Sequence, residues 1–104
     1  MEIHWRNMDE VELDEREATE RKLRALADGH SDLIDLRISA KPNHHHRHGA
    51  QEVHITCQAR GKEIVAARTG ADLGQALHDA LDAFVAEVRR LRDRRADHRT
   101  VTEG

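Results

Sequence analysis

The sequence contains very few aromatic residues, cysteines and prolines. Trp5 and Phe84 are the only aromatic residues among 104, so Leu, Ile, Val and Ala must build the hydrophobic core. The single cysteine, Cys57, excludes an internal disulfide and is typical of a protein in a reducing cytosol. No apolar run approaches the ~20 residues that span a bilayer, and the N-terminus lacks the basic region and apolar core of a signal peptide. These absences predict a soluble, cytoplasmic protein with no membrane partner.

Motifs for catalysis and for small-molecule binding are also lacking. The chain has no glycine-rich phosphate loop, nucleophile elbow or paired-metal motif. Cys57 falls on the apolar side of an alternating segment, which indicates a buried small residue rather than a nucleophile. Histidines 44, 45, 46 and 48 can bind zinc, copper or nickel, but with no cysteine or carboxylate close in sequence they indicate a loop with adventitious affinity. We therefore expect no enzyme activity, no small-molecule substrate, no cofactor and no dedicated metal site.

The length and the charge distribution limit the kind of protein further. A chain of 104 residues forms one domain with a modest core. The net charge is −3, yet residues 9–20 carry seven acids against one arginine, and residues 89–99 carry six arginines against two aspartates. This asymmetry leaves room for a local basic surface on an acidic molecule.

Apolar periodicity predicts two helices. Between residues 73 and 91 apolar side chains recur at steps of three and four, which places them on one wide stripe, and Asp72 is a suitable N-cap. A shorter helix is expected over residues 15–27, with Asp14 as its N-cap and Glu17 completing a capping box. Gly29 is a natural C-terminal stop for this helix. The wide stripe of the long helix must be covered by a sheet or by another helix.

Alternation of apolar and polar residues predicts four strands. We expect them over residues 1–6, 33–41, 52–59 and 63–69, with a tight turn at residues 60–62. In the second strand, which Pro42 ends, the residues expected to face the core are Ile34, Leu36, Ile38 and Ala40.

The predicted order β-α-β-β-β-α indicates an α+β fold. Most of the strand connections are antiparallel hairpins, so one face of the four-stranded sheet can be exposed to solvent while both helices cover the other face, as in a two-layer sandwich. We expect one domain over residues 1–97 and a frayed, flexible C-terminal tail over residues 98–104.

Three pieces of the chain match motifs of a known family in the right order and with similar spacing. Residues 22–26, Lys-Leu-Arg-Ala-Leu, match a Lys-apolar-x-x-Leu pattern that ends the family's first helix. Residues 52–67, with a hairpin centred on Gly61, are similar to its third and fourth strands. Residues 72–81 are similar to the Asp-x-Tyr-x-Ala-Ile-Asp-x-(Leu/Val)-(Leu/Val) run that opens its second helix. From residue 1 to about residue 93, the chain thus resembles the ribosome hibernation promoting factors, also called ribosome-associated inhibitor or protein Y proteins.

The resemblance implies both the β-α-β-β-β-α fold and a function. Family members bind the small ribosomal subunit in the channel that mRNA and tRNA would occupy, where lysines and arginines on the two helices contact rRNA phosphates. They silence ribosomes under stress by occupancy, without catalysis, and members with only this domain lack the dimerising extension of longer relatives. The basic residues that we expect to contact rRNA here are Lys22, Arg24, Lys41, Arg89, Arg90 and Arg92.

Departures from the family pattern leave an alternative open. Ala83 and Ala86 stand where family members usually have lysine or arginine, Gly74 stands where an aromatic is usual, and the first helix opens with acids. The arginines near the C-terminus can also be a solvated helix end that complements the helix dipole. The alternative is a protein-interaction module, dimeric, that keeps the fold but no longer binds ribosomes. A continuous basic strip between the helices favours rRNA, whereas acidic patches that break the strip favour a protein partner.

Overall fold

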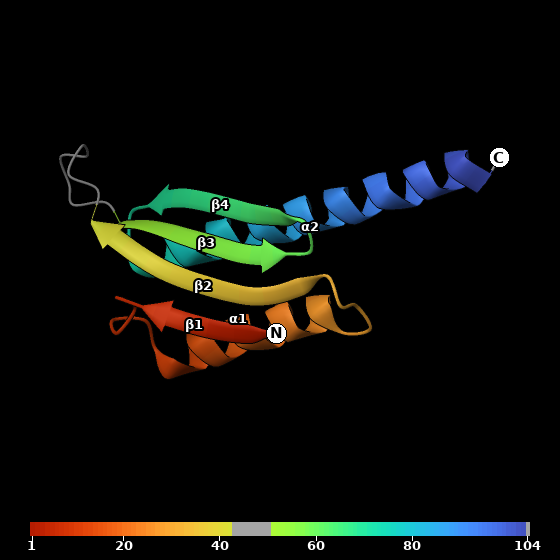
Figure 1. The fold of residues 1–104 in the computed structure, drawn as a ribbon. Helices are drawn as coiled ribbons and strands as arrows, with labels where there is room; N and C mark the ends of the chain where they lie inside the picture. The colour runs from red at the N-terminus through yellow and green to blue at the C-terminus, as the bar shows by residue number, and fades with distance from the viewer. Residues whose placement is uncertain (43–50, 104) are drawn as a thin grey trace.

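The computed structural model describes the backbone of residues 1–42 and 51–103 and the side chains of residues 1–41 and 51–94. The elements follow one another in the predicted order (Figure 1): β1 (Glu2–Arg6), α1 (Leu13–Ala27), β2 (Leu33–Pro42), β3 (Gln51–Ala59), β4 (Lys62–Gly70) and α2 (Leu73–Glu103). The histidine loop of residues 44–48 lies outside the described residues, so its metal affinity stays a prediction. None of the described helices combines the length and the apolar character that crossing a membrane requires.

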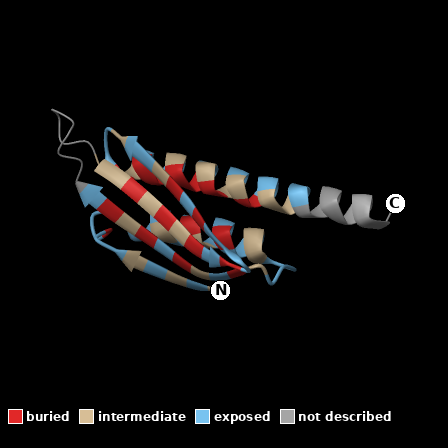
Figure 2. Ribbon diagram, turned by 45° about the horizontal axis from the view of Figure 1, so that its top comes forward, coloured by how far each residue is buried: buried red, intermediate tan, exposed pale blue. Residues whose placement is uncertain are grey.

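The sheet is mixed and its strands lie in the order β1-β2-β3-β4. β1 pairs with β2 in parallel, which requires a crossover connection, and α1 provides it. β2 and β3, and then β3 and β4, pair antiparallel. At the β3–β4 turn Gly61 has a φ of +72°, a conformation that glycine adopts without steric cost. Both helices lie on the same face of the sheet (Figures 1 and 2), which confirms the predicted two-layer α+β sandwich.

The core lies mainly between the sheet and α2. The side chains that fill it come from alternate positions of the strands and from the stripe of α2, as Figure 2 shows, and the largest that are fully buried include Leu36, Ile38, Ile55, Phe84 and Val88. α1 contributes much less, because only Thr19 and Leu23 are buried on it. The Thr19 hydroxyl donates a hydrogen bond to the Glu15 carbonyl oxygen at 2.8 Å, so its burial leaves no unpaired group.

The start of α1 differs from the prediction. The helix begins at Leu13, and its N-cap is Glu12, which makes no side-chain cap hydrogen bond. The predicted cap by Asp14 is therefore wrong, and Asp14 lies in the first turn, where its charge complements the helix dipole. Tertiary contacts explain the difference, because Met8 and Val11 are buried ahead of the helix and hold its N-terminal end against the core.

The start of β2 also differs. Ile34 is 51 % exposed whereas Leu33 is 6 % exposed, because the pairing with β3 shifts register between Leu33 and Asp35. Such a bulge places an extra residue in one strand and reverses the alternation before it. The prediction that Ile34 faces the core is wrong, and the predictions for Leu36, Ile38 and Ala40 are confirmed.

The N-terminus of α2 agrees with the prediction. Asp72 Oδ1 accepts a hydrogen bond from the Gln75 backbone N–H at 2.8 Å, which confirms Asp72 as the N-cap. The helix continues to Glu103, through the stretch for which the sequence predicts a frayed tail. The division of the chain at residue 97 stays a prediction.

Candidate nucleic-acid interface

An open groove separates the two helices. Its wider part has a volume of about 640 Å³ and is lined by Lys22, Ala25, Leu26, Asp28 and His30 on one side and by Asp82, Val85, Ala86, Arg89 and Arg92 on the other. A second hollow of about 210 Å³ lies between the same helices, towards the N-terminal ends of both, and it shares Lys22. Small residues on the facing sides of the helices, among them Ala18, Ala25, Gly74 and Ala86, leave this space open.

Two bases in the groove have charges that are available to a ligand. Lys22 on α1 and Arg89 on α2 are both exposed and line the wider part of the groove. Within residues 1–41 and 51–94, neither makes an ion pair or a side-chain hydrogen bond. The fold thus brings together two unpaired cations that are 67 positions apart in the sequence.

Arg92 lines the same groove, but its charge is neutralised. Its Nε donates to Asp32 Oδ2 at 2.8 Å and its Nη2 donates to Asp32 Oδ1 at 3.0 Å. The side chains of Arg92 and Asp32 are only 19 % and 13 % exposed, so this bidentate pair is largely shielded from water. The hydrogen bonds from Arg92 hold the pKa of the Asp32 carboxyl below its ordinary value of 3.8. This ion pair connects the α1–β2 loop to α2.

The other three predicted bases lie outside the groove lining. Arg24 is exposed on α1 and its Nη1 lies 3.4 Å from the Met1 carbonyl oxygen. Arg90 is paired with Glu87, one turn earlier on α2, at 2.6 Å. Lys41 is exposed near the end of β2, opposite Glu52 of β3. The structure therefore groups Lys22, Arg89 and Arg92 and separates Arg24, Lys41 and Arg90 from them. Contact of any of the six with rRNA stays a prediction.

Acidic side chains interrupt the positive charge of the groove. Asp28 and Asp82 line it beside the basic side chains, and Ala86 lines it without adding a charge. Ala83 instead packs against the core. Sequence reasoning missed both the acids of the groove and the pairing of Arg92 with Asp32. No local signal could have revealed that pair, because its members are 60 residues apart.

Cys57 contributes no chemistry to a site. It is fully buried, as predicted, and burial raises the pKa of its thiol to about 11. A thiol with that pKa stays protonated near neutral pH, and the thiolate is the reactive form.

Comparisons with known proteins agree with this fold. The family model of the sigma 54 modulation protein / S30EA ribosomal protein family matches residues 1–96. A ribosomal subunit interface protein from Coxiella burnetii is similar in structure, with a TM-score of 0.69 and 16 % identity over 89 % of this chain and 99 % of that chain. The N-terminal domain of Thermus thermophilus Protein Y has a TM-score of 0.63 and 19 % identity over 86 % of this chain and 94 % of that chain.

These two structural likenesses show the fold alone, and a sequence comparison with curated proteins gives no match. The family match is stronger, because it spans residues 1–96 and so includes β1 to β4, α1 and the part of α2 that lines the groove. The resemblance seen in the sequence is confirmed, and the chain belongs to the sigma 54 modulation protein / S30EA ribosomal protein family.

Proposed function

We propose that this protein is a cytoplasmic hibernation factor that binds the small ribosomal subunit and inhibits translation by occupancy. The observation that carries the proposal is the groove between α1 and α2, where Lys22 and Arg89 face a common space without acidic partners among the described side chains. Membership of a family with ribosomal members, and a fold shared with a ribosomal subunit interface protein, support it further.

Two basic side chains of the groove, Lys22 and Arg89, suit contact with a phosphate backbone. Each base that neutralises an RNA phosphate releases condensed counterions, so binding is insensitive to sequence and weakens as salt rises. Lys22 and Arg89 supply such charges from two elements whose separation the sheet fixes. Asp28 and Asp82 repel phosphates at the same place, so we expect a weaker salt dependence than in a fully basic groove.

Co-sedimentation with purified small subunits across a salt series tests the proposal. The groove variant carries Lys22→Glu and Arg89→Glu. The control carries Lys62→Glu and Arg68→Glu, which change the net charge equally on exposed positions of β4 outside the groove. We expect the native protein and the control to bind at low salt and the groove variant to bind weakly. The plot of the logarithm of the association constant against the logarithm of the salt concentration should be less steep for the groove variant, with a slope smaller in magnitude by about 1.5–2.

Two results would contradict the electrostatic mechanism. One is binding that responds neither to salt nor to the groove substitutions. The other is an equal loss of binding in the groove variant and in the control, because net charge rather than the groove would then determine the affinity.

The acids in the groove favour a second candidate function, a dimeric protein-interaction module that no longer binds ribosomes. Asp28 and Asp82 break the basic strip, and Leu26, Val85 and Ala86 supply apolar surface between them. If this candidate holds, the native protein fails to sediment with small subunits at low salt. It also forms a concentration-dependent dimer in sedimentation equilibrium, and Val85→Arg dissociates that dimer.

A further inference from the structure

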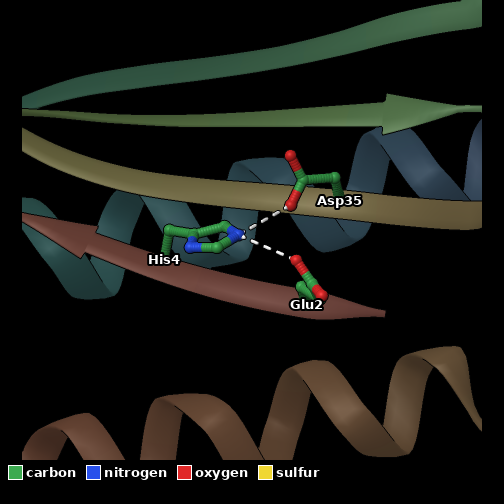
Figure 3. Close-up of side chains that lie close together, drawn as sticks. All are labelled: Glu2, His4 and Asp35. Atoms are coloured by element: carbon green, nitrogen blue, oxygen red, sulfur yellow. Dashed lines mark hydrogen bonds and ion pairs between the residues drawn. The ribbon is translucent and has the colours of Figure 1, made fainter.

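Three metal-ligating side chains converge on the sheet face that the helices leave open. They are Glu2 and His4 on β1 and Asp35 on β2, and Figure 3 shows them pointing towards one another. His4 Nε2 lies 3.2 Å from Glu2 Oε2 and 3.0 Å from Asp35 Oδ1, and the three donor atoms lie within 4.8 Å of one another. None of the three lines the groove between the helices.

The backbone holds this cluster in place. In the parallel ladder Glu2 is the register partner of Asp35. His4 is two residues further along β1, so it projects from the same face as Glu2. The intervening Ile3 packs against the core on the other side. Convergence therefore follows from strand pairing rather than from a flexible loop.

One oxygen of the cluster lacks a hydrogen bond. Asp35 Oδ1 is shielded from solvent, and no donor among the described residues reaches it with hydrogen-bonding geometry. His4 Nε2 instead makes its hydrogen bond with Glu2 Oε2. One imidazole nitrogen cannot serve both carboxylates equally, whereas a cation between the three donors satisfies all of them.

We propose that Glu2, His4 and Asp35 form a binding site for a divalent transition metal, with zinc as the best fit. Zinc–ligand distances of about 2.0–2.2 Å place neighbouring donors of a tetrahedral site about 3.3 Å apart, close to the two separations seen here. An imidazole ligand favours zinc over magnesium or calcium, which prefer oxygen ligands alone. Three protein ligands leave the fourth position to water.

Arg37 modulates this site. Its Nε lies 3.7 Å from Asp35 Oδ2, the oxygen that does not face His4, so this contact leaves Oδ1 for the metal. Its positive charge also opposes a cation nearby, so Arg37→Gln should bind zinc more tightly than the native sequence. A bound ion would join β1, a short edge strand, to β2.

Zinc titration by calorimetry tests the proposal, in a background chain in which histidines 44, 45, 46 and 48 are replaced by asparagine. This background removes the other imidazole-rich segment of the sequence. We expect one zinc ion per chain, with binding lost in His4→Asn and in Asp35→Asn. The matched control is His54→Asn, because His54 pairs with a single carboxylate, Glu52, at 3.1 Å, and this variant should bind as the background does.

A structural readout accompanies the titration. Saturating zinc should slow amide hydrogen exchange in β1 of the background chain and leave exchange in His4→Asn unchanged. If His4→Asn or Asp35→Asn does not fold, Glu2→Gln replaces it, since that side chain is 80 % exposed and its loss cannot unfold the domain. Absence of zinc binding in the background chain, or binding that these substitutions leave intact, overturns the proposal.

Discussion

Replacing Arg92 with methionine should cost more stability than removing any other single charge from residues 73–94, the part of α2 whose side chains the structure describes. The guanidinium makes two hydrogen bonds to one carboxylate, and both side chains are largely buried. Exposed ion pairs contribute about 0–1 kcal/mol, and breaking a fully buried pair costs about 3–5 kcal/mol. The remaining exposure of this pair places the expected loss between these limits, at about 2–3 kcal/mol, most of it from leaving Asp32 without its partner.

Urea unfolding at neutral pH measures this loss, and a double-mutant cycle with Asp32→Asn isolates the pair. For a domain of this size the loss corresponds to a decrease in Tm of roughly 10–20 °C. Arg90→Met is the control, because the Arg90–Glu87 pair is exposed and its removal should cost under about 1 kcal/mol. A coupling energy near zero between the Asp32 and Arg92 substitutions would refute the reasoning.

The same ion pair determines a pH dependence. The folded pKa of Asp32 is lowered, so its contribution is complete above the unfolded value of about 3.8 and is lost as pH falls through the folded pKa. The stability difference between the native protein and Arg92→Met should therefore be constant near neutral pH and should narrow below about pH 3.8. A difference that does not change in acid would show that Arg92 acts through packing alone.

Further predictions concern the packing of the core and of the turn before α2. Gly70→Ala should destabilise the fold by about 1–3 kcal/mol in urea unfolding, because its Cβ would lie 2.7 Å from the Ala76 backbone nitrogen and 3.2 Å from the Asp72 carbonyl oxygen. Gly74→Ala is the contrasting variant, because the three atoms nearest to its Cβ are side-chain oxygens at 3.4 Å or more. The gain in helix propensity should therefore leave stability unchanged or raise it by up to about 1 kcal/mol. Equal losses for the two glycines would contradict the steric argument. The Cys57 thiol should react with a disulfide reagent at pH 8 only as fast as the protein unfolds, because it is buried and its pKa is about 11; reaction at the rate of a free thiol in the folded protein would show that the site is open.

Local signals in the sequence were sufficient for most of the secondary structure. The stripe of α2 and its Asp72 cap depend on residues within one or two turns of each other, so they can be recognised without knowing what the helix packs against. The alternation in β2 predicted the buried positions Leu36, Ile38 and Ala40 for the same reason. The two errors arose where distant contacts decided the outcome: burial of Met8 and Val11 moved the start of α1, and pairing with β3 introduced the bulge that exposes Ile34.

The candidate sites depended on the tertiary structure to a much greater degree. Periodicity assigns a side chain to a face of its own helix or strand, but it does not say which faces of distant elements meet. The sequence alone therefore determined the order of elements, the α+β class and the set of available bases. Only the packing of both helices on one sheet face decided that Lys22 meets Arg89 across a groove and that Asp32 neutralises Arg92. Likewise, only the parallel pairing of β1 with β2 placed Asp35 beside Glu2 and His4, because chain segments far apart in sequence become neighbours through burial of their apolar sides.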